Sequence, residues 1–157
     1  MLIRPMRPED YPAVDAMMSD LHSLHVAARP DLYAPAEHIY AREEYLRKLD
    51  DPAMICLLAE EDGAPAGLCF TEMRRRTCMR NIPSAYMDDL YVRPGSRRTG
   101  LATALFRAAE REARARGAVR LDLMVWSFNE SALAFYRSLG MRPQRYILEM
   151  PLKEDNA

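Results

Sequence analysis

The sequence has no long apolar run, few cysteines and almost no net charge, and each shortage excludes a class of protein. No stretch of the 157 residues approaches the roughly 20 apolar residues of a membrane-spanning helix, and the N-terminus lacks the apolar segment of a signal peptide. Cys56, Cys69 and Cys78 have no metal-type spacing, which favours a reducing, cytoplasmic compartment and predicts no bound metal. A net charge of −1 argues against a nucleic-acid-binding surface.

What remains is a chain of suitable length for one domain spanning residues 1–157, with strands and helices alternating along it. Apolar runs and alternation predict strands, and apolar residues three or four positions apart predict helices. The expected strands cover residues 2–6, 53–60, 65–73, 84–92, 119–126 and 145–152. The expected helices begin near residues 10, 36, 101 and 130, and the second ends near residue 49.

The stretch from residue 87 to 117 reads as strand, basic turn and amphipathic helix. The first N–H groups of a helix have no internal partner, and the helix dipole adds partial positive charge there. Small residues at Gly100 and Ala102 would let a ligand approach those groups, and Arg97 and Arg98 add full charges. This pattern favours a pyrophosphate cradle, although a polar turn with solvated arginines remains the alternative. It matches neither a Walker loop nor a three-glycine dinucleotide fingerprint.

Two blocks of sequence resemble the GCN5-related N-acetyltransferase (GNAT) superfamily. Arg97-x-x-Gly100-x-Ala102, preceded by residues 89–92 and Pro94, is similar to its acyl-CoA signature, and residues 125–141 resemble its second conserved block. The resemblance implies an α/β (α+β) GNAT fold, with about four helices around a mixed, mostly antiparallel sheet of about seven strands. It also implies an acetyl-CoA donor, an acyl-CoA-binding core at about 84–140 and, by analogy alone, a homodimer.

The resemblance assigns roles to particular residues. Tyr136 matches a general acid that protonates the CoA sulfur, although an aromatic residue on the core face of a helix is the plainer interpretation. Asp88 occupies the position of a glutamate in related diamine acetyltransferases and would act as general base through a water, or else be a solvent-facing acid. Asp88 and Asp89 are expected to alternate across the strand. The coenzyme-binding residues implied are Leu90, Tyr91, Val92, Arg97, Arg98, Thr99, Gly100, Leu101, Ala102, Thr103, Asn129 and Ser131.

The acceptor is expected to be a primary amine of a small molecule, because the segment from residue 22 to 40 is long enough to cover the cleft. His25, Tyr33 and Asp89 are the candidate acceptor-binding residues. Alternatives are a protein N-terminus or lysine as acceptor, or a module that senses acyl-CoA without catalysis. A basic cluster, formed by Arg74, Arg75, Arg76 and Arg80, is interpreted as a solvated hairpin end or as a contact for CoA phosphates or an acidic acceptor.

Overall fold

The computed structural model describes residues 1–75 and 82–152, so Arg76, Cys78 and Arg80 lie outside the described residues. The chain divides into two compact units, Met1–Met124 and Val125–Ala157. In the described ranges, no helix combines the length and apolarity needed to cross a membrane. A single domain over residues 1–157 stays a prediction.

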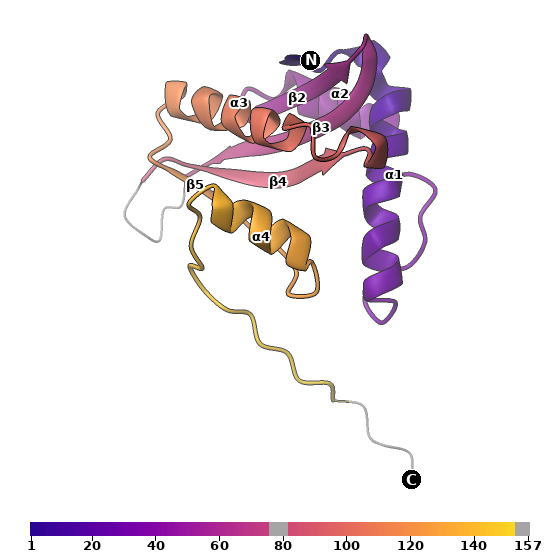
Figure 1. The fold of residues 1–157 in the computed structure, drawn as a ribbon, viewed down its shortest axis with the longest axis vertical. Helices are drawn as coiled ribbons and strands as arrows, with labels where there is room; N and C mark the ends of the chain where they lie inside the picture. The colour runs from indigo at the N-terminus through magenta and orange to yellow at the C-terminus, as the bar shows by residue number, and fades with distance from the viewer. Residues whose placement is uncertain (76–81, 153–157) are drawn as a thin grey trace. The chain divides into compact units, whose positions relative to one another are not determined.

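The first unit contains a sheet in the order β1-β2-β3-β4-β5 (Figure 1). Its strands are β1 (Leu2–Pro5), β2 (Met54–Glu61), β3 (Ala64–Arg74), β4 (Ser84–Val92) and β5 (Arg120–Leu123). The first four pair antiparallel, and β4 and β5 pair in parallel. The predicted mixed, mostly antiparallel sheet is therefore confirmed. The predicted count of about seven strands was too high, because the described residues form five.

Helices cover both faces of this sheet. Figure 1 shows α3 (Leu101–Ala115) in front of the strands and the paler, more distant α2 (Arg42–Asp50) behind them. The face opposite α3 holds a core shared with α1 (Tyr11–Ala28). This core is built on Met6, Val14, Met17, Met18, Tyr45, Leu58, Leu68, Phe70 and Tyr91. The apolar spacing of residues 14, 17 and 18 places them on the inward side of α1, as the sequence predicted.

Gly67 in β3 explains why α3 approaches the sheet so closely. A Cβ atom at this position would lie 2.8 Å from the carbonyl oxygen of Tyr91 and 3.1 Å from Cδ1 of Leu105. Only glycine leaves that space, and a side chain here would force β3, β4 and α3 apart. Because α3 begins with the predicted cradle, Gly67 helps to fix the position of the cradle against β4.

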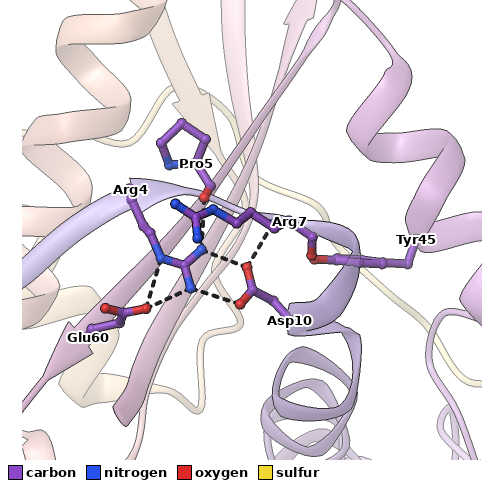
Figure 2. A network of polar contacts seen from close by, with 6 residues as sticks. All are labelled: Arg4, Pro5, Arg7, Asp10, Tyr45 and Glu60. Atoms are coloured by element: carbon purple, nitrogen blue, oxygen red, sulfur yellow. Dashed lines mark hydrogen bonds and ion pairs between the residues drawn. The ribbon is translucent and has the colours of Figure 1, made fainter. Parts of the chain in front are cut away.

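The junction between β1 and α1 is held by a buried ion-pair network (Figure 2). The Arg4 guanidinium donates to both carboxylate oxygens of Asp10, at 2.7 and 2.8 Å, and to Glu60 on β2. Asp10 is only 7% exposed and also accepts the backbone N–H of Arg7 at 2.7 Å. The Tyr45 hydroxyl donates to the Arg7 carbonyl. The network therefore ties β1, β2, α1 and α2 together.

The second helix is shorter than the sequence predicted. It was expected over about residues 36–49, but α2 begins at Arg42, and Ala41 is extended with ψ 155°. The segment before it is used for tertiary contacts instead: the Tyr40 carbonyl accepts a hydrogen bond from the Tyr11 hydroxyl, and the Tyr40 ring packs edge-on against Phe70. Tertiary contacts at Tyr40 thus outweigh the local helical pattern.

In the second unit, α4 (Glu130–Ser138) is present, but the predicted strand over residues 145–152 is wrong. A strand needs a neighbouring strand edge to accept and donate its backbone hydrogen bonds, and no strand is assigned to residues 141–152. Their large side chains are exposed instead. These are Tyr146, Ile147, Leu148, Met150 and Leu152, at 77–91% exposure. The expected strand over 119–126 is likewise reduced to residues 120–123.

Candidate active site

The parallel pairing of β4 and β5 is short, which leaves the end of β4 apart from β5. Their ladder runs from the Ser84–Arg120 pair to the Met87–Leu123 pair and stops there, whereas β4 continues to Val92 in pairing with β3. In the described part of the first unit, residues 88–92 therefore have no partner strand on the β5 side. An extended ligand could pair with this edge as an added strand.

The segment from Arg97 to Thr103, where the sequence predicts the cradle, leads from β4 into the first turn of α3. Arg98 and Gly100 both have left-handed backbones, with φ of 67° and 89°, and Gly100 is the N-cap of α3. No described protein group accepts a hydrogen bond from the backbone N–H groups of residues 98–103. The left-handed turns and the helix start thus leave several N–H donors available to an anion, with the positive end of the α3 dipole behind them.

The two arginines of the cradle behave differently. The Arg97 side chain turns back and donates from Nε to the Val92 carbonyl at 3.1 Å, with its guanidinium carbon 6.0 Å from the centre of the Tyr91 ring. This contact links the cradle to the end of β4. Arg98 is exposed and holds a left-handed φ. Both positive charges therefore lie on a segment whose backbone donors are also free.

Tyr91 can serve a coenzyme only through its backbone. Its side chain is 5% exposed, belongs to the core shared with α1, and donates from its hydroxyl to Asp20 at 3.2 Å. The predicted roles of Leu90, Tyr91 and Val92 therefore depend on main-chain groups, which side-chain substitutions do not remove. These roles stay predictions.

A β-bulge sits where β4 loses its pairing with β5. Asp89 opposes Phe70 and Met87 opposes Thr71, so Asp88 is an extra residue with no partner in β3. A bulge breaks the two-residue alternation of side chains. Asp89 accepts a hydrogen bond from the Tyr40 hydroxyl at 3.1 Å, and Asp88, but not Asp89, lines the pocket that Tyr40 also lines. The expectation that only one of the two acids faces the acceptor cleft stays a prediction.

This pocket, which we call the acceptor pocket, lies on the α2 side of the sheet and has a volume of about 550 Å³. It is lined by Tyr40, Glu44, Arg47, Lys48, Asp51, Met54, Glu72, Arg74 and Asp88. Arg74 donates to Glu72 at 2.6 Å and to Asp88 at 3.1 Å, and its guanidinium carbon lies 3.8 Å from the centre of the Tyr86 ring. Arg74 thus binds acids of the same pocket, in contrast to the solvated or phosphate-binding roles expected of the basic cluster.

The two aspartates of the bulge have raised pKa values. Burial raises the pKa of Asp88, and the nearby Arg74 charge opposes that rise. Burial also raises the pKa of Asp89 to about 6; the Tyr40 hydrogen bond opposes this, and the charge of Asp88 adds to it. Burial and the charge of Asp89 raise the pKa of the Tyr40 hydroxyl, so it stays protonated as a donor. Carboxylates with raised pKa values are suited to accept protons near neutral pH.

We expect Asp89→Asn to stabilise the protein at neutral pH. The pKa of Asp89 rises from 3.8 to about 6 on folding, so its favourable contribution is complete below pH ~4 and is lost as the pH rises through about 6. At pH 7.5 the native protein holds a disfavoured charge that asparagine lacks, while the amide oxygen still accepts from Tyr40. Because Asp89 is only partly buried, we expect a gain of about 1–2 kcal/mol in the free energy of unfolding.

Urea denaturation of both proteins between pH 4 and 8 measures this difference. The two stabilities should converge as the pH falls toward 4, where Asp89 is protonated in the native state and increasingly protonated in the unfolded state. A wild-type protein that is equally stable or more stable than the variant at pH 7.5 would contradict the raised pKa.

His25 and Tyr33, predicted to bind the acceptor, lie together at the end of α1. Their rings stack with centres 5.2 Å apart, and the edge of His22 meets the same tyrosine. Burial lowers the pKa of His25, so the imidazole is neutral at pH 7. Neither residue lines the acceptor pocket, whereas Asp89 lies beside it through Tyr40. Their acceptor-binding roles stay predictions.

The other predicted residues belong to the second unit. The Asn129 side-chain oxygen accepts the Ala132 N–H at 3.1 Å and the Ser131 hydroxyl at 3.1 Å, which makes Asn129 the N-cap of α4. Tyr136 lies on α4, with its ring centre 5.2 Å from that of Phe135, and its carbonyl accepts the Met141 N–H. The coenzyme-binding and acid roles of these residues stay predictions.

Several pocket residues were not found from the sequence. Lys48, Arg47 and Glu44 come from α2, in a segment where charged residues alternate with apolar ones and suggest an ordinary solvated helix face. Only the tertiary fold brings them opposite Asp88. Tyr40, which lies just before α2, also lines the pocket.

The mixed sheet, the short β4–β5 ladder and the turn before α3 have the arrangement of the GNAT fold. Residues 18–141 match the acetyltransferase (GNAT) family, and the chain belongs to that family. It is 45% identical over 51 residues to the thialysine N-epsilon-acetyltransferase of Caenorhabditis elegans, a match covering 32% of each chain. The chain thus spans about a third of the length of this curated relative.

Two solved structures share the fold over nearly the whole chain. A mutant protein from Bacillus halodurans superposes with a TM-score of 0.93, at 25% identity, and the match covers 98% of this chain and 100% of that one. The aminoglycoside antibiotic 6′-N-acetyltransferase from Acinetobacter haemolyticus gives a TM-score of 0.75 at 22% identity, over 99% of this chain and 100% of the other. The second likeness is one of fold alone.

Proposed function

We propose that the chain is an acetyl-CoA-dependent N-acetyltransferase that acetylates a primary amine of a small molecule within a ternary complex. The observation that carries the proposal is the cradle, whose backbone donors at residues 98–103 have no acceptor among the described residues. A diphosphate fits such a site because it offers several anionic oxygens to a helix start. The unpaired edge of β4 leads from this cradle to the bulge and the acceptor pocket.

The reaction needs an amine without its extra proton and a protonated leaving group. Asp88 accepts the proton of the acceptor ammonium through a water. The amine nitrogen then attacks the thioester carbon, the new C–N bond forms and the C–S bond breaks. Main-chain N–H near Leu90 stabilises the developing oxyanion, and a single such donor typically contributes about 3–4 kcal/mol. Tyr136 donates a proton to the leaving sulfur, and the attacking nitrogen releases its remaining excess proton to solvent.

Two observations support a small amine as the acceptor. The acceptor pocket has a volume of about 550 Å³, and its lining holds four acidic and three basic residues, so a small amine can meet a carboxylate there. The names of the relatives also concern small amines, namely thialysine and aminoglycosides. Of these two relatives, the thialysine acetyltransferase shares the higher sequence identity with this chain. Amines of the size of thialysine are therefore the first to test.

The proposal can be tested by measuring the release of free thiol from acetyl-CoA with a panel of amines, amino acids and peptides. Turnover with a small amine and none with peptides is the expected result. Turnover with peptides alone would show that the acceptor is a protein and not a small molecule. Tight acetyl-CoA binding without turnover on any member of the panel would instead indicate a sensing module.

We expect Gly100→Val to weaken acetyl-CoA binding about 10- to 100-fold, because the loss of one or two hydrogen bonds to charged phosphate removes about 1.5–3 kcal/mol. Gly100 has a φ of 89°, which a β-branched residue rarely adopts. Gly63→Val is the matched control, since Gly63 has a φ of 77° and equally open surroundings but lies in the β2–β3 turn. Calorimetric titration with acetyl-CoA should show a loss for Gly100→Val only, and equal affinities in both variants would contradict the cradle.

A further inference from the structure

Arg74 spans the two strands that form the floor of the acceptor pocket. In the register of β3 with β4, Glu72 opposes Tyr86 and Arg74 opposes Ser84. Because the strands are antiparallel, Arg74 and Asp88 lie on opposite sides of the Glu72–Tyr86 pair. Arg74 must therefore reach across this pair to contact Asp88.

Three contacts fix the Arg74 side chain in that reach. Its guanidinium carbon lies 3.8 Å from the centre of the Tyr86 ring, a distance at which the aromatic face attracts the cation. Its Nε donates to Glu72 at 2.6 Å and its Nη2 to Asp88 at 3.1 Å. Since the guanidinium is planar and rigid, two of these contacts already set the direction of the N–H that meets Asp88.

Asp88 depends on this contact more than an ordinary strand residue would. It is the extra residue of the bulge, so it has no partner in β3, and it lies beyond the end of the β4–β5 ladder. In the described ranges of the chain, Arg74 is the one group that forms a hydrogen bond or ion pair with its carboxylate. The orientation of the carboxylate therefore rests on Arg74.

Arg74 also sets the charge around Asp88. Burial raises the pKa of Asp88; the charge of Arg74 opposes that rise, the charge of Glu72 adds to it, and Lys48 opposes it less than Arg74 does. Arg74 counters the rise in two ways, because it is also the ion-pair partner of Glu72. The other titratable or charged groups that line the pocket or adjoin Asp88 are Tyr40, Glu44, Arg47, Lys48, Asp51 and Asp89.

Building on the proposed function, we propose that Arg74 is a positioning residue for acetyl transfer, which aims the Asp88 carboxylate at the acceptor and keeps it ionised in mildly acidic solution. Arg74 does not touch the reacting atoms and acts only through Asp88. A water between Asp88 and the acceptor ammonium then meets a carboxylate of fixed direction. Without Arg74, the carboxylate loses its support and takes up a proton at higher pH, because Glu72 is left without its counter-charge as well.

The test is the pH dependence of kcat/KM between pH 4.5 and 8 at saturating acetyl-CoA. The acceptor is the amine of the panel that is acetylated fastest, beginning with thialysine. An alkyl ammonium group stays protonated in this range, so the fall in rate toward acid reports a group of the enzyme. For Arg74→Met, the ratio of wild-type to variant kcat/KM should grow about 5- to 10-fold from pH 8 to pH 4.5.

A second measurement follows Asp88 directly and needs no acceptor. Carboxyl-carbon NMR titration of the free protein, with the Asp88 signal assigned by its loss in Asp88→Asn, should show a higher pKa for Asp88 in Arg74→Met than in the wild type. Because burial also raises the pKa of Asp89 to about 6, the rate measurements are repeated with Asp89→Asn in both proteins. The growth of the ratio should persist there.

Two further variants separate the role of Arg74 from a general loss of charge. Arg74→Lys keeps the charge without the planar fork, so it should restore most of the pH dependence and less of the rate at pH 8. Arg107→Met is the matched control, because Arg107 binds Glu110 at 2.7 Å and lies 5.6 Å from the centre of the Phe106 ring, but does not line the acceptor pocket. It should leave the ratio unchanged. Circular dichroism establishes that each variant is folded, and Arg74→Gln, which is also uncharged, replaces a methionine variant that does not fold.

The outcomes separate this inference from the proposed function. A ratio that stays constant with pH in Arg74→Met, or a pKa of Asp88 that does not rise, would overturn the positioning role and leave the acetyltransferase intact. A raised pKa of Asp88 without any change in the pH dependence of the rate would overturn it too, because the proton acceptor would then be another group. Binding of acetyl-CoA by the wild type without turnover of any amine would overturn the proposed function itself, and this role with it.

Discussion

We expect the substitution Arg4→Met to lower the free energy of unfolding by about 3 kcal/mol, which is the largest stability change that we predict for a single side chain. Arg4 is 16% exposed and Asp10 is 7% exposed, so the loss of the guanidinium leaves a carboxylate buried without its cation. The same change removes the hydrogen bonds to Glu60 that join β1 to β2 (Figure 2). Urea denaturation at pH 7 measures the loss.

The dependence of this loss on pH follows from the pKa of Asp10. Hydrogen bonding to Arg4 holds that pKa below its ordinary value. The resulting stability is present above the unfolded carboxylate pKa, near 4, and disappears as the pH falls through the depressed native value. The difference between wild type and Arg4→Met should therefore be greatest near neutral pH and shrink in strong acid.

Two further variants distinguish the network from a general effect of charge removal. Arg4→Lys should recover part of the stability, because an ammonium group cannot match the two-pronged contact of the guanidinium. Arg114→Met removes an exposed arginine from the pair with Glu110 and should change the stability by about 0.5 kcal/mol or less. Equal losses of stability for Arg4→Met and Arg114→Met would show that the buried network stabilises the fold no more than an exposed ion pair does.

The second large effect concerns catalysis. If Tyr136 protonates the leaving sulfur, we expect Tyr136→Phe to lower kcat about 100-fold, within the range typical of a lost general acid, with little change in the KM for acetyl-CoA. The substitution removes only the hydroxyl, and the backbone contacts that end α4, including the Met141 N–H to the Tyr136 carbonyl, remain. Steady-state rates of thiol release from pH 6 to 10 measure the effect.

A matched control is available in the same unit. Tyr146 is 82% exposed, and Tyr146→Phe should leave kcat unchanged. A Tyr136→Phe variant that is as fast as the wild type would remove the acid role and leave the leaving thiolate to take its proton from solvent.

Much of the first unit was predictable because its signals are local. Val14, Met17 and Met18 have the spacing of a core-facing helix and are buried in α1. The strand from residue 84 to 92 and the turn at Gly100 were both expected, since apolar strand formers and a glycine before a helix are properties of neighbouring residues. The order of the elements followed from these local patterns, and the family resemblance agreed with it.

The parts that could not be predicted depend on contacts between distant segments. The bulge at Asp88 exists only in the register with β3, and the pairing of Arg4 with Glu60 joins residues 56 positions apart. Likewise, Lys48 becomes a pocket residue only because α2 packs beside β2. The strand expected at residues 145–152 contains strand-forming apolar residues such as Tyr146 and Ile147, but these alone supply no partner strand.

The extra residue in β4 also uncouples the two halves of that strand. Any shift of register caused by an insertion or deletion before Met87 can be taken up at the bulge, because Asp88 has no partner to lose. The segment from Asp89 to Val92 would then keep its pairing with β3 while the first half of β4 drifts. This strand can therefore tolerate length variation at its start without disturbing the residues that lead to the predicted cradle.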